Sequence, residues 1–315
     1  MAAHPAALPP NLSVLERGWL SSNSVLLTGG DGPCLVDTGY ALHAEQTVAL
    51  VRQACIGQPL RQIVNTHLHS DHCGGNAALQ LAYPHVKISV PASQTQAVVN
   101  WDEHSLTYAA TGQQCPRFSC HHGLHPGQEV TLAGQHWQVH AAPGHDNDAL
   151  MLFLAQTRTL ISADALWEDG FGVLFPLLLH DEHTIDTTAR TLRTIEQLRP
   201  AWVIPGHGAP FHQVEAALQR AHGRLAHIAQ YPDKHRLHAA QVLIKFHLMQ
   251  VKRIPRAAML AWALATPYLQ RIAQHTAGIA PGDTEAQRQW IDQLLHRLMT
   301  KGAIEVSSEW VQDVG

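Results

Sequence analysis

The sequence predicts a layered α/β domain followed by a smaller, mainly helical one, on the basis of two observations. Up to about residue 232, short strand-like runs alternate with helical segments, a pattern typical of helices packed on β-sheets. Further along the chain, apolar residues recur at helical spacing, as at Ala240, Ile244, Leu248 and Val251. We therefore expect one domain over residues 1–232 and a second over residues 233–315.

The first half of the α/β domain should contain strands that lead into one loop. The expected elements are strands at residues 24–27, 34–37, 61–66 and 87–91, and helices at about 43–55 and 74–81. The turn at residues 29–32 contains three glycines, which can adopt the positive φ angles of a tight hairpin. Gly57 is expected to end the first helix.

The second half begins with a stretch, residues 93–125, that shows no clear period. We expect it to be a partly helical excursion that forms a pocket wall or a subunit contact. Periodicity then returns, with strands expected at residues 129–132, 137–142, 149–153, 159–163 and 201–204 and a helix at about 185–198.

The composition is typical of a soluble globular protein. Apolar residues make up 45% of the chain, charged residues 15%, and the net charge of −4 gives no indication of a polyanionic partner. The longest apolar run, residues 171–179, is too short to span a bilayer, and residues 1–5 lack the features of a secretory signal. The five cysteines are odd in number and show no disulfide pattern. We therefore expect a cytoplasmic protein without a membrane partner.

The most informative stretch is residues 66–75, in which His67, His69, Asp71 and His72 fall within six consecutive positions. One face of a helix or strand cannot present all four side chains, so this segment should be a loop wrapped around a ligand. Neutral imidazole and carboxylate groups are the ligands that zinc and related ions prefer. Because the chain has 24 histidines, a histidine-rich surface loop is the alternative.

Three later strands each run into a further residue of the same kind. They lead to His145, Asp164 and His207, respectively. Both histidines follow a Pro-Gly pair, in which proline fixes the approach of the chain and glycine lets the backbone bend. Loops at strand ends commonly carry function in α/β proteins. Seven such residues at strand ends therefore predict a metal site.

Together these residues resemble the signature of the metallo-β-lactamase superfamily, His-x-His-x-Asp-His followed by distant His, Asp and His. The resemblance covers about residues 12–215 and implies a four-layer αββα sandwich with two divalent metal ions at one edge. Zn²⁺ is the expected ion, and Fe or Mn could occupy the same ligands. The resemblance assigns His67, His69 and His145 to the first ion, Asp71, His72 and His207 to the second, and Asp164 to both as a bridge.

This arrangement makes chemical sense for hydrolysis. Two divalent ions that share a water lower its pKa towards 7, which provides a bridging hydroxide, and they polarise the bond under attack. Asp71 is placed to orient the nucleophile and accept its proton. Asp37 and Thr66 are the first candidates to orient the imidazole rings, and Asp146 and Asp148 the next.

The resemblance also narrows the substrate. True β-lactamases of the superfamily generally lack the bridging aspartate, so Asp164 favours the glyoxalase II, lactonase and nuclease-like branches. Lactonases carry a tyrosine where this chain has Trp167, and glyoxalase II enzymes carry basic residues that are absent from residues 165–171. Trp167, Phe171 and Phe175 are expected to line the pocket, with core packing as the alternative.

We therefore predict hydrolysis of a small ester, thioester or lactone. The enzymatic alternatives are an endoribonuclease and a β-lactamase, and the non-enzymatic alternative is a metal-stabilised binding protein.

The C-terminal segment resembles a winged helix. Pro255 and Pro267 could each open a helix, residues 284–287 form a capping-box pattern, and residues 303–306 and 310–311 suggest a terminal hairpin. Some members of the superfamily that join these two domains cut RNA. However, residues 235–315 hold nine Lys/Arg and six Asp/Glu, a net charge of only +3, and a nucleic-acid module should be more basic. We expect docking, homodimerisation or pocket shaping instead of nucleic-acid binding.

Overall fold

The computed structural model describes residues 8–178, 181 and 183–315. The expectation about residues 1–5 and the last residue of the apolar run 171–179 lie outside this part. Among the described residues, no helix is long and apolar enough to cross a membrane.

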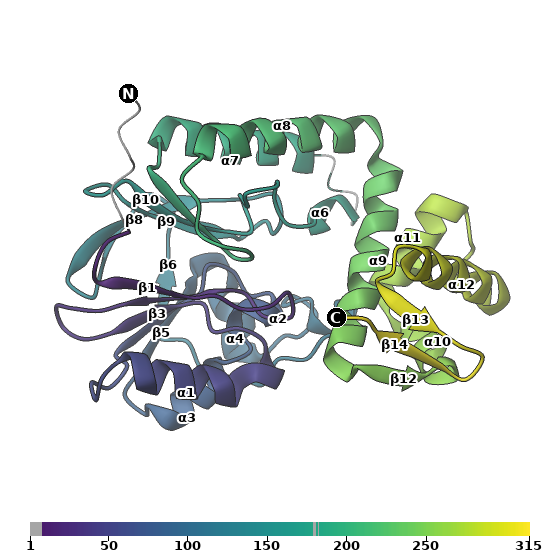
Figure 1. The fold of residues 1–315 in the computed structure, drawn as a ribbon, viewed down its shortest axis with the longest axis horizontal. Helices are drawn as coiled ribbons and strands as arrows, with labels where there is room; N and C mark the ends of the chain where they lie inside the picture. Colours follow the sequence, from purple (N-terminus) through teal and green to yellow (C-terminus); the bar gives the residue numbers. More distant parts are fainter. Residues whose placement is uncertain (1–7, 179–180, 182) are drawn as a thin grey trace.

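The first sheet has six strands in chain order, and two helices cover its outer face. β1 (Leu12–Leu15), β2 (Ser24–Leu27) and β3 (Cys34–Val36) pair antiparallel, and β4 (Gln62–Val64), β5 (Lys87–Pro91) and β6 (His122–Leu124) extend the sheet in parallel. α1 (Ala44–Ala54) and α3 (Asn76–Ala82) lie below this sheet in Figure 1. The short helix η1 (Ala41–His43) leads into α1. Every element except β1, β6 and η1 was expected from the sequence.

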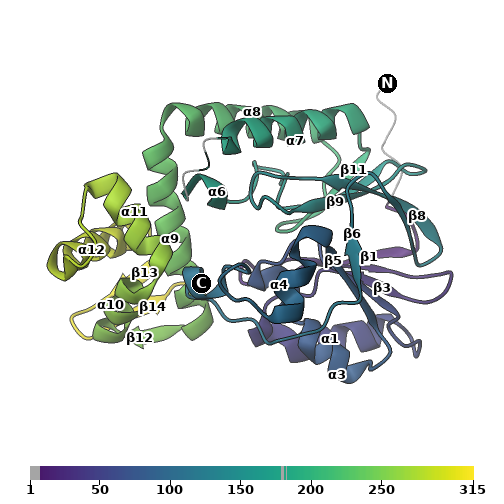
Figure 2. The same cartoon turned by 180° about the vertical axis from the view of Figure 1, so that it is seen from behind.

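The second sheet has five strands and carries its helices on the opposite side of the molecule. Its order is β11 (Trp202–Pro205), β10 (Thr159–Ala163), β9 (Leu150–Leu154), β8 (Gln135–Ala141) and β7 (Glu129–Leu132), with only the β10–β11 pair parallel. α7 (Thr184–Leu198) and α8 (Val214–Gln230) lie above it in Figures 1 and 2. α8 was not among the expected elements, although its buried residues follow helical spacing: Val214, Ala217, Leu218, Ala221, Leu225 and Ile228.

Three hydrophobic clusters hold these layers together. Val36 and Val64 of the first sheet share a cluster with Leu152 and Ile161 of the second, so the two sheets pack face to face. One outer cluster joins the first sheet to α1 and α3, and another joins the second sheet to α7 and α8. Burial of apolar surface stabilises each contact by about 25 cal/mol per Å². The four-layer αββα sandwich predicted from the sequence is confirmed.

The stretch at residues 93–125 is partly helical, as expected. It contains η2 (Ala92–Gln94), α4 (Thr95–Asn100) and α5 (Tyr108–Thr111) before it reaches β6. At its tip the carbonyl of Gly112 accepts a hydrogen bond from Nε1 of Trp262, 3.4 Å away. The excursion therefore contacts the C-terminal part of the chain.

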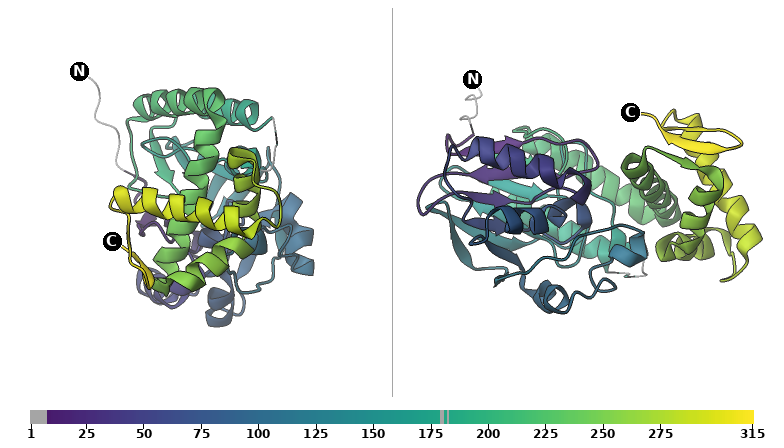
Figure 3. Two further views of the ribbon diagram at one scale, coloured as in Figure 1. Left: turned by 90° about the vertical axis from the view of Figure 1, so that its right-hand side faces the viewer. Right: turned by 90° about the horizontal axis from the view of Figure 1, so that it is seen from below.

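The C-terminal part lies beside the sandwich (Figure 3). Its hydrophobic cluster also includes Val173 and Leu178 from the preceding part of the chain. Its helices are α9 (Pro232–Val251), α10 (Arg256–Ala265), α11 (Pro267–Ala277) and α12 (Thr284–Thr300). Its strands are β12 (Arg253–Pro255), β14 (Trp310–Asp313) and β13 (Ile304–Val306), in that spatial order. The expected helices after Pro255 and Pro267 are present, and the expected hairpin gains β12 as a third strand.

One expected detail of this part is wrong. α12 is capped by Asp283, whose side chain accepts a hydrogen bond from the backbone nitrogen of Ala286 at 3.1 Å. Thr284 is instead the first helical residue. The aspartate carboxylate satisfies a free N–H group of the first turn, so the capping pattern begins one residue earlier than the sequence suggested.

Candidate metal centre

The loop after β4 presents the first four donor side chains. His67 and His69 lie in irregular backbone, whereas Asp71 and His72 lie in α2 (Ser70–Cys73), a single helical turn. The segment was expected to be a loop throughout, so α2 is a correction. Because the chain changes from extended to helical at His69, the four side chains can approach one space from different directions.

Three strand ends bring the remaining donors to the same place. His145 follows β8, Asp164 follows β10 directly, and His207 follows β11. The ligand atoms fall into three groups, within each of which all atoms lie within 4.8 Å of one another: His67, His69 and His145; His67, His72 and Asp164; and Asp71, His72 and His207. All seven predicted donors therefore converge.

Asp164 lies between two sets of histidines. Its Oδ1 is 3.5 Å from Nε2 of His72, and its Oδ2 is 3.3 Å from Nε2 of His145 and 4.0 Å from Nε2 of His207. The same Nε2 of His207 lies 3.2 Å from Oδ2 of Asp71. The two carboxylates thus lie among the imidazoles of His72, His145 and His207.

Hydrogen bonds on the outer side of the His67 and His72 rings set their orientation. Nδ1 of His72 donates to Oδ2 of Asp37 at 2.7 Å, and Oδ1 and Oδ2 of Asp37 also accept from the backbone N–H and hydroxyl of Thr66. Since the Thr66 hydroxyl donates to Asp37, its lone pair can accept from Nδ1 of His67, 3.2 Å away. Both rings then direct the lone pair of Nε2 into the cluster, which is the tautomer a metal ion needs.

The rings of His145 and His69 also have partners on their outer side, whereas Nδ1 of His207 is buried without a hydrogen-bond partner among the described residues. Nδ1 of His145 donates to the carbonyl of Val173 at 2.6 Å, and Nε2 of His69 lies 3.5 Å from Oδ2 of Asp146. Nδ1 of His69 and Nε2 of His145 then face each other across 2.7 Å, close enough for both to bind one cation. Asp37, Thr66 and Asp146 were candidates from the sequence. Asp148 was a candidate too, but it contacts Asp146 through its backbone nitrogen, and its side chain makes no hydrogen bond or ion pair with a histidine of the cluster among the described residues. The Val173 carbonyl was not a candidate, because a backbone acceptor leaves no sequence signal.

The donor atoms fit a cation. Nε2 of His67 and Nε2 of His72 are buried and have no hydrogen-bond partner among the described residues, and an unsatisfied buried polar atom costs free energy. Burial lowers the pKa of His67 well below its usual value and lowers that of His69 and His145 to about 4. These three imidazoles are therefore neutral near pH 7, the form that binds metals.

The pKa values of the two carboxyl groups and of His72 shift in opposite directions. Burial opposes ionisation of Asp71 and Asp164, but the adjacent His72 and other histidines outweigh it and lower the pKa of both carboxyl groups. Burial also opposes the charged form of His72, but Asp37, Asp164 and Asp71 raise its pKa well above the usual value. The cluster therefore holds both carboxylates ionised, as a divalent cation requires. His72 favours a proton on both ring nitrogens until a bound cation displaces the one on Nε2.

Close packing keeps Asp164 in this position. A Cβ atom on Gly206 would overlap Oδ1 of Asp164, so only glycine fits there. Asp37 and Ala163 have φ angles of 57° and 47°, a region that costs about 1–3 kcal/mol at non-glycine residues and is common at functional sites. The backbone is thus constrained at Asp37, Ala163 and Gly206, next to the donor cluster.

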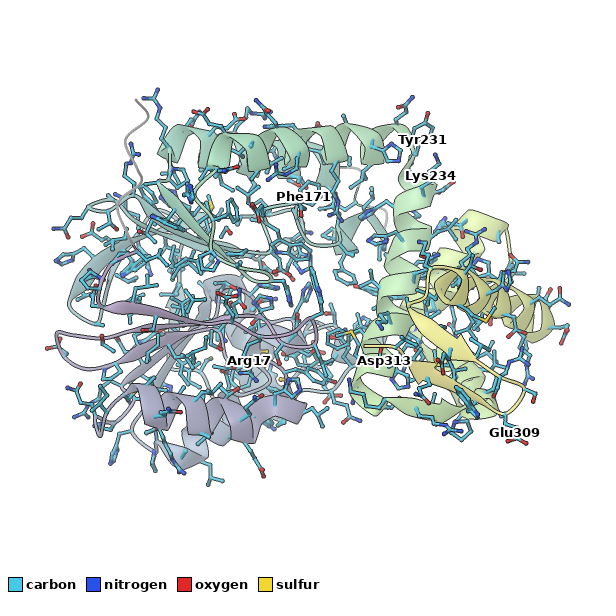
Figure 4. The ribbon with its side chains drawn as sticks, in the orientation of Figure 1. Arg17, Phe171, Tyr231, Lys234, Glu309 and Asp313 are labelled. Carbon is cyan, nitrogen blue, oxygen red and sulfur yellow. The ribbon has the colours of Figure 1, made fainter. Side chains whose placement is uncertain are left out.

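A cavity of about 380 Å³ opens beside the donor atoms. Trp167 and Phe175 line it as predicted, and Nε1 of Trp167 donates to Oδ1 of Asp164 at 3.2 Å. Phe171 does not line this cavity, which corrects the prediction for that residue. Its ring is 1% exposed in the core beneath α8, where the guanidinium of Arg224 covers it at 5.0 Å (Figure 4).

Two groups of cavity residues were not anticipated. Trp19, in the turn between β1 and β2, stacks on His207 with ring centroids 5.3 Å apart and planes inclined by 12°. From the C-terminal part, α9 contributes His238, Val242, Leu243 and Phe246. Nothing in the local sequence pairs either group with the donor cluster. The C-terminal part therefore shapes the cavity, which was one of the roles expected for it.

Comparison with known proteins identifies the family of this arrangement. Residues 17–207 match the family model described as "Metallo-beta-lactamase superfamily". The chain is 28% identical over 194 residues to the "Beta-lactamase-like protein 2 homolog" of Caenorhabditis elegans, a match that covers 61% of this chain and 58% of the relative. All seven donors, and the groups that orient their rings, lie within the range of the family model.

A second curated relative and a solved structure provide two further comparisons. The chain is 29% identical over 166 residues to a "Hydroxyacylglutathione hydrolase" of Synechococcus sp. (strain JA-3-3Ab), covering 52% of this chain and 55% of that enzyme. It thus spans less than two thirds of the length of both curated relatives. A metallo-beta-lactamase family protein from Thermus thermophilus superimposes with a TM-score of 0.56 and 20% identity, covering 98% of this chain and 100% of that one. At this identity the likeness shows the fold alone.

Proposed function

The chain belongs to the metallo-β-lactamase superfamily, and from this premise we propose that it is a hydrolase that uses two divalent metal ions to cleave a small ester, thioester or lactone. One observation carries the proposal: Asp164 lies between the two proposed ligand sets, with Oδ1 3.5 Å from His72 and Oδ2 3.3 Å from His145 and 4.0 Å from His207. A carboxylate in this position can bridge two cations. The hydrolases among the relatives support the reaction class.

The proposed ligand sets follow from the three groups of donor atoms. His67, His69 and His145 would hold one ion, and Asp71, His72 and His207 the other, with Asp164 shared. Zn²⁺ suits these nitrogen and oxygen donors, and Fe or Mn could replace it. Bound there, divalent ions would supply Lewis-acid polarisation of the substrate and acidification of a water molecule.

The residues of the chain have separate tasks in this proposal. Asp71 lies at the cavity, and its lowered pKa keeps it ionised near pH 7, so it can accept a proton from the nucleophile. Trp167 and Phe175 provide apolar contact for the substrate and limit the entry of water. Asp37 keeps His72 in the required tautomer. A small substrate with an apolar portion suits a cavity of about 380 Å³.

The structure offers little support for the endoribonuclease alternative. Three basic residues at the start of the C-terminal sheet are engaged within the chain. Lys252 pairs with Asp313 at 3.2 Å, Arg253 lies over the ring of Trp310 at 4.3 Å, and Arg256 pairs with Asp292 at 2.7 Å. Binding of RNA phosphates would have to displace these contacts. We propose that this part shapes the cavity, and detectable RNA binding at low salt would contradict that role.

Metal content and activity together test the proposed function. Elemental analysis of the purified protein should find close to two metal ions per chain, and a panel of ester, thioester, lactone, β-lactam and RNA substrates should show turnover of the first three classes. Asp164→Ala should lose metal and activity together, because two cations would face each other with less negative charge between them. Asp148→Asn, a carboxylate outside the three donor groups, is the matched control. An active Asp164→Ala protein would rule out the bridging role.

A further inference from the structure

Arg224 is a cation that lines the cavity and has no anionic partner among the described residues. It lies on α8 and lines the same cavity as the donor cluster. No hydrogen bond or ion pair joins its guanidinium to any residue in the described part of the chain. Arg220, one turn earlier on α8, differs in this respect, because it donates to the carbonyl of Glu168 at 2.8 Å and pairs with Asp169 at 3.2 Å.

Phe171 and Gly170 pack against the side chain of Arg224. Its guanidinium carbon lies 5.0 Å from the centre of the Phe171 ring, a cation–π distance. A Cβ atom on Gly170 would lie 3.0 Å from both Cδ and Nη1 of Arg224, and Gly170 has a φ angle of 130° that favours glycine. Figure 4 shows Phe171 below α8, the helix that carries Arg224. Aromatic face and glycine together hold the guanidinium in the wall of the cavity.

Its chemistry requires a counterion. Burial lowers the pKa of Arg224, yet arginine remains charged at any pH at which the protein folds. A charge that is partly withdrawn from water and has no partner is costly. Asp169 does not neutralise it, because that carboxylate is 91% exposed and pairs with Arg220. The neighbouring wall from α9 consists of Val242, Leu243 and Phe246, which are apolar, and His238, which cannot supply a negative charge.

We propose that Arg224 binds a carboxylate of the substrate, so that the preferred substrate is an ester, thioester or lactone whose acyl part carries a free carboxylate. This inference rests on the proposed function. Guanidinium and carboxylate match in shape and form two parallel hydrogen bonds. Arg224 is the only Lys or Arg among the described residues that line this cavity. A singly charged carboxylate therefore fits better than a phosphate group, which carries up to two charges.

A matched pair of substrates tests the preference. The probes are mono-4-nitrophenyl glutarate, which has a free carboxylate, and its methyl ester, which has none. The metal-loaded wild-type chain should hydrolyse the acid with a kcat/KM at least about tenfold higher, as expected for a charge-assisted hydrogen bond. In R224Q the ratio of the two kcat/KM values, acid over methyl ester, should fall towards 1. In R224K the ratio should be intermediate, because lysine keeps the charge but not the paired geometry. R220Q should keep the wild-type ratio.

Calorimetric titration with glutarate provides a second readout that needs no turnover. The wild-type chain should bind glutarate, R224Q should lose that binding, and neutral glutaramide should bind neither protein. If the wild-type chain hydrolyses the acid and its methyl ester with equal kcat/KM, Arg224 does not bind the carboxylate. The same conclusion follows if R224Q still prefers the acid. If no ester, thioester or lactone is hydrolysed, the proposed function fails, and the titration alone decides the role of Arg224. Absence of glutarate binding to the wild-type chain then overturns it.

Discussion

Oδ2 of Asp37 lies 2.7 Å from Nδ1 of His72 and also accepts the hydroxyl hydrogen of Thr66 at 2.7 Å. Through Thr66, the same carboxylate influences His67, whose Nδ1 is 3.2 Å from the threonine hydroxyl. Asp37 is itself held in a left-handed backbone conformation, with a φ angle of 57°. One strained residue at the end of β3 thus orients two histidines of the donor cluster.

The first prediction concerns this residue. Asn tolerates the left-handed region, so Asp37→Asn should keep the backbone but place an amide where His72 needs a carboxylate. His72 can then shift its proton to Nε2 and lose its free lone pair. We expect the affinity for Zn²⁺ to fall by about 10- to 100-fold, measured by competition with a chelator. Asp148→Asn should match the wild type, and unchanged affinity in Asp37→Asn would contradict the orienting role.

A second prediction uses the close contact at Gly206. In Gly206→Ala the new methyl group would overlap Oδ1 of Asp164, so the carboxylate must move and metal affinity should fall by at least about tenfold. Gly223→Ala is the matched control, because its methyl group would meet no atom within 4 Å and it lies inside α8. That control should raise the free energy of unfolding by about 0.5–1 kcal/mol. Normal metal affinity in Gly206→Ala would mean that Asp164 need not occupy its present position.

A third prediction concerns acid stability. His235 is buried, its Nε2 accepts a hydrogen bond from the backbone of Leu174 at 3.1 Å, and burial together with nearby cations lowers its pKa to about 3. In the unfolded chain the pKa is near 6.5. The unfolded state therefore binds the proton first, so this stabilisation is present above pH 6.5 and declines as the pH falls towards 3.

Denaturant titrations at pH 7, 6, 5 and 4 measure this effect. His235→Gln, whose amide oxygen can accept the same hydrogen bond, should make stability less dependent on pH by up to about 1.4 kcal/mol per pH unit over this range. The exposed His85 provides the control, since His85→Gln should leave the slope unchanged. An equal slope in His235→Gln and the wild type would show that His235 does not titrate in this way.

The fourth prediction concerns Trp167, whose indole nitrogen donates to Asp164 at 3.2 Å. Trp167→Tyr reduces the bulk beside the donor cluster and offers a phenol hydroxyl, so activity on simple lactones should rise relative to aryl esters while metal content stays the same. Trp167→Ala should relax selectivity mainly through KM, because apolar ground-state contact is lost. Trp101→Tyr, in a separate aromatic cluster, is the control. An unchanged substrate ranking in both variants would place the specificity elsewhere.

Much of the fold could be predicted because periodicity is a local property. The strands at residues 24–27 and 87–91 have the expected bounds, and glycine and proline positions indicated several helix ends. β12 was missed because three residues cannot display an alternating pattern, and its pairing with β14 depends on the distant end of the chain. The start of α12 was misplaced by one residue because Asp283 and Thr284 are both good caps.

By itself the sequence determined the chemistry of the donor cluster. Imidazole and carboxylate residues in one short segment and at three later strand ends indicated a metal site, and all seven converge. Only the tertiary structure decided what surrounds that site. Trp19 stacks on His207, Arg224 enters the cavity wall, and Phe171 turns into the core. Residue type limits what a side chain can do, whereas the packing of the layers and of α9 decides which side chains reach the cavity.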